Sequence, residues 1–427
     1  MKKMLSGILS AVMCVGVIAG GTVPVMAEER VVTIYSSKDA WKDQCAEAAK
    51  RIEETYGIKA DVVAMPNTDI ESVIATKLAT NDPPDIIFSN VPQTVEQYNI
   101  TEKGEILDEE PWVERLAAKD VLTYKDGHIY GMPTYVSGNF FGGVYYNKEK
   151  MKELGYDNPQ PKTMDEFWAI LEDIKSQGVT PVYMTDADPW TTQVWTTMGW
   201  GVVLDEKKDT IYNDLLTNKI RFTDIPEMEE VLQGLQDIYT KGYANENHAS
   251  QTYDTSMAVV GEGEYPMVIQ GEWFEIAMND AYPDVELGSF AIPFGDKDMI
   301  AIGAYTEGAY VPKGENSELA KEYLRYWSSP EILGPVFESY PCASAWVDVD
   351  GGDLLPAQKN LIENYVNTGK YTYEFDAYFD VARPIMEDYL FRNIVEVTMG
   401  KEPAEAIKDW DERYNEFMRD KEIEGFN

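Results

Sequence analysis

The sequence predicts an α/β fold in which helices cover a mostly parallel sheet. Runs of β-branched residues alternate with helical segments, in the order strand 31–35, helix 40–56, strand 60–63, helix 70–79 and strand 86–88. The length of 427 residues fits about two or three domains. Because no linker rich in Ser, Gly or Pro divides the chain, we expect lobes that share several crossings of the backbone.

Local signals mark several helix ends. Gly57 stands where a left-handed residue would end the helix 40–56. Thr163 and Glu166 have the spacing of a capping box, which predicts a helix that runs to Ser176. The remaining predicted elements are a strand at 265–269 and helices at 224–241, 317–328, 385–399 and from Pro403 onwards.

Composition excludes several classes of protein. The chain has 36 Lys and Arg against 75 Asp and Glu, a net charge of −39, so it would repel nucleic acid. Its two histidines, His128 and His248, have no partner at metal spacing, which argues against a histidine-centred zinc site or a Ser-His-Asp triad. The segment 348–353 faintly resembles a calcium loop but lacks the terminal Glu. We therefore expect no metal and no cofactor.

The N-terminus has the pattern of a signal peptide. Lys2 and Lys3 precede an apolar run, and Ala27 closes an A-x-A-like cleavage site, which predicts removal of residues 1–27 and export of the rest. An uncleaved membrane anchor and lipoprotein processing at Cys14 are the alternatives. In the mature chain, Cys45 and Cys342 could form one disulfide, although two buried unpaired thiols are the simpler interpretation.

Polar and aromatic residues at element ends indicate a ligand site. Ser36 and Ser37 follow the first predicted strand, and Ser89 and Asn90 follow the third, where ligands bind in parallel sheets. Two further segments pair an acid with a tryptophan that can stack on the C–H face of a sugar: Asp188-Pro189-Trp190 and Gly271-Glu272-Trp273. By contrast, the helical spacing of Trp112, Trp168, Trp327 and Trp410 predicts core packing.

Paired acids in an aromatic groove also describe glycoside hydrolases. The candidate acids are Asp186, Asp188, Glu272 and Glu307. Nothing in their local sequence sets an acid–base pair apart from solvated carboxylates, so a secreted hydrolase stays the alternative to a binding protein. A binder of peptides, amino acids or metal is a further alternative.

Seven short motifs follow one another along residues 31–417: 82–88 (DPPDIIF), 126–133 (DGHIYGMP), 146–148 (YNK), 161–167 (PKTMDEF), 271–273 (GEW), 317–321 (SELAK) and 400–403 (GKEP). Together and in this order they resemble the extracellular solute-binding proteins of sugar ABC transporters, the family that includes maltose-binding protein. The resemblance implies a two-lobed, periplasmic-binding-protein-like type II fold that closes around a hinge. It implies a monomer that binds a neutral mono- or oligosaccharide and delivers it to membrane permease subunits, without catalysis.

The resemblance also implies where the lobes and the ligand lie. Lobe one would hold 28–137 plus 302–342 and lobe two 138–301 plus 343–427, with crossings near 135–139, 301–305 and 340–346. Asp188-Pro189-Trp190 is similar to the family's acid-Pro-aromatic step, and Trp273 to its stacking tryptophan. The expected ligand-binding set is Ser36, Ser37, Asp39, Ser89, Asn90, Tyr135, Asn139, Asp188, Trp190, Glu272, Trp273 and Glu307.

Overall fold

The computed structural model describes residues 30–38, 40–134 and 142–426. Three groups of predictions therefore fall outside the described residues: the signal peptide with Cys14, the site residue Asp39, and the first crossing with Tyr135 and Asn139. Within the described ranges, no helix is long and apolar enough to cross a membrane.

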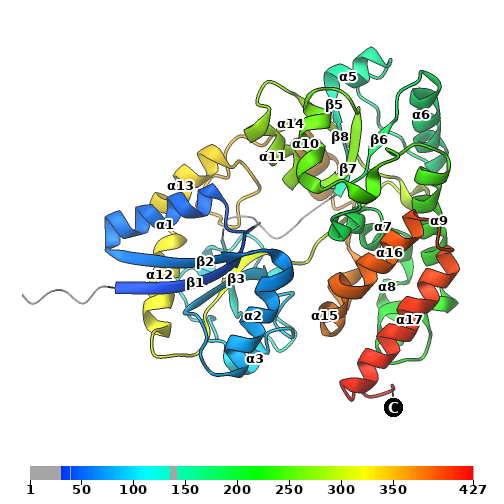
Figure 1. The fold of residues 1–427 in the computed structure, drawn as a ribbon. Helices are drawn as coiled ribbons and strands as arrows, with labels where there is room; N and C mark the ends of the chain where they lie inside the picture. The colour runs from blue at the N-terminus through cyan, green and yellow to red at the C-terminus, as the bar shows by residue number, and fades with distance from the viewer. Residues whose placement is uncertain (1–29, 39, 135–141, 427) are drawn as a thin grey trace, which may run out of the picture.

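The first lobe is built on a five-stranded sheet in the order β2-β1-β3-β10-β4 (Figure 1). β1 (Arg30–Ser37) lies parallel to β2 (Ile58–Met65) and β3 (Ile86–Val91), as the strand–helix alternation predicted. β10 (Thr306–Tyr310) joins antiparallel between β3 and β4 (Gly131–Pro133). The helices of this lobe are α1 (Asp43–Tyr56), α2 (Asn67–Ala79), α3 (Ile100–Lys103), α4 (Lys119–Leu122), α12 (Ser317–Trp327) and α13 (Pro330–Ser339).

The second lobe has a four-stranded sheet in the order β6-β7-β5-β8. Its strands are β5 (Gly142–Asn147), β6 (Val182–Tyr183), β7 (Met267–Gly271) and β8 (Leu287–Phe290). β5 pairs antiparallel with both β7 and β8, and only the β6–β7 ladder is parallel. The α/β prediction with mixed sheets is confirmed, but "mostly parallel" is wrong for this sheet, because its strands arrive from distant segments whose direction no local pattern encodes.

Helices pack on this second sheet and beyond it (Figure 1). They are α5 (Lys148–Glu153), α6 (Met164–Ser176), α7 (Thr197–Leu204), α8 (Lys208–Leu216), α9 (Pro226–Thr240), α10 (Tyr253–Gly261), α11 (Trp273–Ala281), α14 (Pro356–Leu361), α15 (Arg383–Ile385), α16 (Arg392–Thr398) and α17 (Pro403–Asp420). The predicted cap is present, since the Thr163 hydroxyl accepts from the Glu166 N–H at 3.2 Å. Gly57 adopts φ +66° at the end of α1, as predicted.

Separate apolar cores define the two lobes. One core gathers buried side chains from Val32 to Met132 and from Ala309 to Val349, and Ile276 of α11 packs into it from the second lobe. Two further clusters hold side chains from Val144 to Ile302 and from Ala357 to Phe426. The first core thus continues to Val349, past the boundary at 342 that the sequence suggested, because the segment after α13 folds back onto this lobe.

A small two-stranded sheet lies where the chain leaves the second lobe. β9 (Ile300–Ile302) pairs parallel with β11 (Tyr371–Tyr373), and four residues after β9 the chain enters β10 of the first lobe. The fully buried side chain of Glu374 lies behind this passage: a Cβ on Gly303 would lie 3.1 Å from its Oε1. The passage is therefore closely packed on one side.

Three of the four tryptophans predicted to pack in the core are buried. Trp112, Trp327 and Trp410 are buried, whereas Trp168 packs against the core but is only half-buried. Cys45 and Cys342 are both buried and unpaired, so the disulfide alternative is wrong. Burial raises the pKa of Cys45 to about 12, which keeps this thiol protonated at neutral pH.

Candidate functional site: a cavity between the lobes

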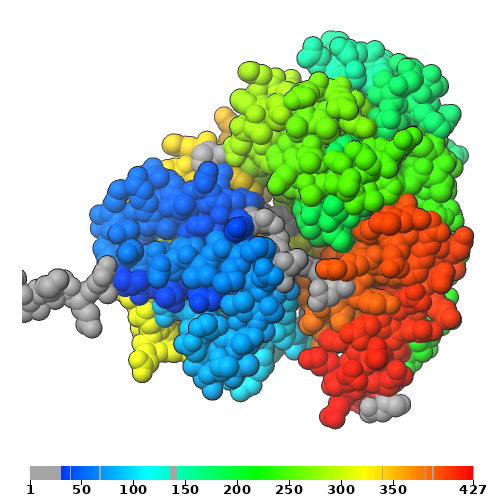
Figure 2. Space-filling model, in the orientation of Figure 1, coloured from blue at the N-terminus to red at the C-terminus, as the bar shows by residue number. Residues whose placement is uncertain are grey.

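A cavity of about 840 Å³ opens between the two lobes. In the space-filling view a blue and yellow body lies beside a green, orange and red body, and a hollow separates them (Figure 2). Both contribute to the lining, which comprises Ser37, Lys38, Ala40, Trp41, Lys42, Asp43, Gln44, Ile70, Glu71, Ile74, Phe88, Ser89, Asn90, Tyr98, Asp188, Trp190, Gln193, Thr252, Tyr253, Asp254, Met257, Trp273, Ile276, Ala277, Asp280, Tyr305, Glu307, Tyr340, Arg383 and Phe391.

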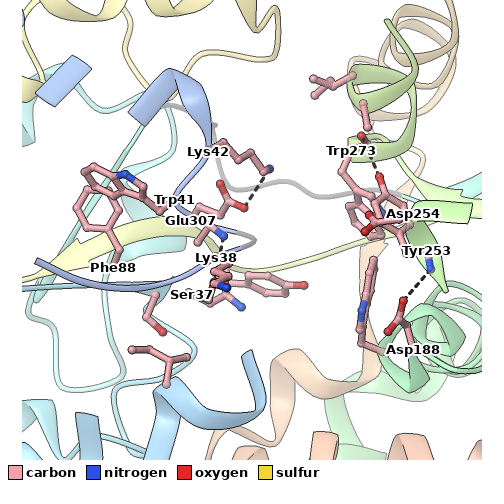
Figure 3. Close-up of a pocket in the computed structure, with 18 of the residues that line it drawn as sticks. Ser37, Lys38, Trp41, Lys42, Phe88, Asp188, Tyr253, Asp254, Trp273 and Glu307 are labelled. Atoms are coloured by element: carbon pink, nitrogen blue, oxygen red, sulfur yellow. Dashed lines mark hydrogen bonds and ion pairs between the residues drawn. The ribbon is translucent and has the colours of Figure 1, made fainter. Parts of the chain in front are cut away.

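On the second lobe, an aromatic cluster forms one wall of the cavity (Figure 3). The ring of Trp190 lies 5.3 Å from that of Tyr253 and 5.9 Å from that of Trp273. The Asp188 carboxylate accepts from the Tyr253 N–H at 2.7 Å, so the loop before the 3₁₀ helix η2 (Pro189–Val194) is tied to the start of α10. Trp190 and Trp273 are half-buried, which leaves part of each indole toward the cavity.

The glycine of Gly271-Glu272-Trp273 has a packing role. A Cβ at Gly271 would lie 2.1 Å from Cζ3 of Trp273, because the indole folds back over the end of β7. The indole N–H donates to the Gln270 side-chain oxygen at 3.2 Å. This position therefore requires glycine, and the Trp273 ring is held at the junction of β7 and α11.

On the first lobe, Trp41 and Lys42 face the cavity from the loop before α1 (Figure 3). The Trp41 ring packs 5.2 Å from Phe88. The Lys42 ammonium lies 3.6 Å from the Glu307 carboxylate and donates to the Tyr340 hydroxyl at 3.3 Å. Burial lowers the pKa of Lys42, but Glu307 and Tyr340 outweigh burial and raise it above its usual value, so this lysine is charged.

The structure brings together seven of the twelve expected ligand-binding residues. The cavity lining includes Ser37, Ser89, Asn90, Asp188, Trp190, Trp273 and Glu307. Ser36 and Glu272 are absent from that lining: Ser36 is completely buried and its hydroxyl donates to the Ser37 carbonyl oxygen, and Glu272 is 5% exposed. In β1 the side chains of Ser36 and Ser37 point to opposite faces of the sheet, so only Ser37 reaches the cavity.

Sequence reasoning missed four prominent lining residues: Trp41, Tyr253, Tyr340 and Arg383. Trp41 had a usable signal, because it follows a predicted strand end by only a few residues. Tyr253 and Arg383 had none, since they reach the cavity only through the packing of α10 and α15 against other elements.

The acids weighed for catalysis are dispersed. Asp188 and Glu307 line the cavity from opposite lobes, whereas Asp186 and Glu272 are buried away from its lining. Asp348 of the calcium-like segment pairs with Arg115 at 2.7 Å. Over the described part of the chain, no group of three or more His, Cys, Asp or Glu residues could hold a metal ion.

Comparison with known proteins decides the family. The family model described as bacterial extracellular solute-binding protein matches residues 36–332, more than half of the chain. The chain belongs to this family. The cavity lies between the two lobes, and small-molecule sites occur preferentially at such domain interfaces.

Individual relatives are distant but cover most of both chains. An uncharacterized ABC transporter extracellular-binding protein of Pyrococcus horikoshii is 26% identical over 74% of this chain and 71% of its own. The multiple sugar-binding protein of Streptococcus mutans is 23% identical over 82% of this chain and 85% of its own. The solved structure titled "SBP RafE in complex with raffinose" matches with a TM-score of 0.75 at 18% identity, covering 91% of this chain and 99% of that one. The two-lobed solute-binding fold is thus shown for this chain.

Proposed function

We propose that this protein captures a neutral carbohydrate in the cavity between its lobes and delivers it to the permease subunits of an ABC transporter. The observation that carries the proposal is the facing pair of aromatic walls, with Trp41 on one lobe and Trp190, Tyr253 and Trp273 on the other. Indole and phenol rings stack on the apolar C–H faces of sugar rings, and beside them Asp188 and Asn90 supply groups that hydrogen-bond hydroxyls.

The size and charge of the cavity favour a neutral oligosaccharide. About 840 Å³ lies toward the upper end of the range for small-molecule sites. The described lining holds six carboxylates (Asp43, Glu71, Asp188, Asp254, Asp280 and Glu307) against three cations (Lys38, Lys42 and Arg383). This excess of negative charge disfavours sugar acids and phosphates.

Relatives support a sugar as the ligand. One is named a multiple sugar-binding protein, and similar structures are titled as a complex with raffinose and as a chitin oligosaccharide binding protein. The family's extracellular description supports removal of residues 1–27 and action outside the cell, and a relative named as an ABC transporter binding protein supports a permease partner. That the protein acts as a monomer is a further part of the proposal.

Closure of the lobes is the proposed mechanism. A ligand that touches both walls favours the closed state by its differential affinity for that state. In this mechanism one lobe rotates relative to the other, and the backbone bends at two crossings: the residues between β9 and β10, and the segment between Val349 and Ala357.

A thermal-shift panel of sugars, peptides and divalent cations tests the proposal. A ligand at about 100 times its dissociation constant should add about 2.7 kcal/mol to the free energy of unfolding. We expect stabilisation by at least one neutral oligosaccharide and unchanged oligosaccharide after prolonged incubation. Stabilisation by peptides or cations alone would refute a carbohydrate ligand, and cleavage products would favour the hydrolase alternative.

A further inference from the structure

We propose that Asp186 is a positioning residue for the second-lobe wall of the binding cavity, holding the loop that carries Asp188 and Trp190. The inference rests on the proposed function, because it assumes that this wall contacts the ligand. Asp186 itself lies outside the cavity lining, and its side chain is completely buried.

Three side chains from three segments converge on the Asp186 carboxylate. The Tyr239 hydroxyl of α9 donates to Oδ1 at 2.9 Å. The Thr398 hydroxyl at the end of α16 donates to Oδ2 at 2.7 Å, and Nδ1 of His248 lies 2.7 Å from the same oxygen. Burial and the Asp186 charge raise the pKa of Tyr239 well above its usual value, so its hydroxyl keeps the proton that it donates.

The loop that begins at Asp186 forms hydrogen bonds with a second segment, 248–253, through three consecutive residues, 186, 187 and 188. The Asp186 N–H donates to the His248 carbonyl oxygen at 3.2 Å, and the Ala187 N–H donates to that of Gln251 at 3.0 Å. The Asp188 carboxylate then accepts from the Tyr253 N–H at 2.7 Å, the bond drawn in Figure 3. These bonds lead from the buried carboxylate to the cavity wall, where the Tyr253 and Trp190 rings meet.

The energetics favour a fixed loop. A buried carboxylate is costly unless it is fully hydrogen-bonded, and hydrogen bonds to charged groups are stronger than neutral ones. Because the donors come from α9, α16 and the 248 segment, the carboxylate can satisfy all of them only in one position of its own loop. That position of Asp186 places Asp188, two residues later, and Trp190, four residues later, on the cavity wall.

Tyr239→Phe tests the inference by removing one donor hydroxyl that lies outside the cavity lining. Tyr243→Phe is the matched control: it removes a hydroxyl that donates to the Glu172 carboxylate at 2.9 Å in the same lobe but away from this loop. We expect Tyr239→Phe to weaken oligosaccharide binding in calorimetric titration by about 10- to 150-fold, the range for one hydrogen bond to a charged group. Tyr243→Phe should leave affinity unchanged.

A ligand-free measurement separates this inference from the proposed function. Hydrogen exchange of the Ala187 and Tyr253 amides should be faster in Tyr239→Phe than in Tyr243→Phe, with or without any sugar. If the wild-type protein binds no sugar while this difference persists, the proposed ligand is wrong but the loop is held as inferred. Equal exchange and equal affinity in the two variants would overturn the positioning role, even if both melt at lower temperature.

Discussion

The Lys42 ammonium and the Glu307 carboxylate lie 3.6 Å apart and join two distant parts of the first lobe at the cavity wall. Lys42 precedes α1, whereas Glu307 lies in β10, directly after the chain crosses from the second lobe. Tyr340 completes the contact at the end of α13. The pair therefore joins the cavity wall to β10, the strand that the chain enters after it crosses from the second lobe.

Glu307→Gln should weaken ligand binding. The substitution removes the charge that raises the pKa of Lys42, so this pKa should fall and the ammonium should lose its fixed position. We expect an affinity loss of about 1 kcal/mol, because both side chains line the cavity but are only half-buried, with 32% of Lys42 and 21% of Glu307 exposed. Calorimetric titration measures it. Glu286→Gln, which breaks the surface pair with Lys148, is the control and should bind normally.

Trp190→Ala and Trp273→Ala should weaken binding more than they destabilise the fold. Each loses one aromatic face, worth about 1.5–3 kcal/mol of binding. Trp327→Ala is the control: its ring is 1% exposed and its indole N–H donates to the Thr134 carbonyl oxygen, so it should cost about 3–5 kcal/mol of stability. Calorimetric titration measures the affinity of all three variants, and thermal melting measures their stability. If Trp190→Ala and Trp273→Ala melt at much lower temperature but bind sugar normally, both tryptophans have only a structural role.

Trp41→Ala should also weaken binding, because this indole lines the cavity from the opposite lobe. We expect a loss of about 1.5–3 kcal/mol, similar to that of either second-lobe tryptophan. The variant also tests lobe closure. Without the Trp41 ring, the sugar contacts the first lobe less, so its affinity for the closed state should exceed its affinity for the open state by a smaller factor. Small-angle scattering should show a smaller ligand-induced decrease in radius of gyration than in the wild type. An unchanged radius in the wild type at saturating sugar would contradict lobe closure.

Glu374→Gln should stabilise the protein at alkaline pH. Burial and the neighbouring Asp376 carboxylate raise the pKa of Glu374 well above its usual range, and Arg383 offsets them only in part. Because the folded-state pKa is raised, the wild type loses stability as the pH rises above the unfolded-state value of about 4.3. The amide does not titrate, so the difference in stability should grow from pH 5 to pH 8 in urea unfolding. The exposed Glu405→Gln serves as the control, and a variant curve parallel to that of the wild type would count against a protonated Glu374.

Much of the fold follows from local sequence. Local patterns predicted β1, β2, β3, α1, α2 and α12 of the first lobe, the cap at Thr163 and the glycine after α1, because each depends on residues within one or two turns of one another. They did not predict α3, α4, α13 or β10. The pairing in the second sheet was not predicted either, since β7 and β8 meet β5 only after more than 100 residues of intervening chain.

By itself, the sequence determined the class of protein and several of the residues that line the cavity. Strand-end loops and the two acid-and-tryptophan segments predicted Ser37, Asn90, Asp188, Trp190 and Trp273 at a ligand site, and all five line one cavity.

Only the tertiary structure decided that Trp41 and Lys42 join the first-lobe wall, and which contacts support the two walls from behind. Lys42 meets Glu307 across more than 260 residues, and Asp186 meets Thr398 across 212. Such contacts leave no periodic pattern, because they arise where packed elements converge rather than along one helix or strand.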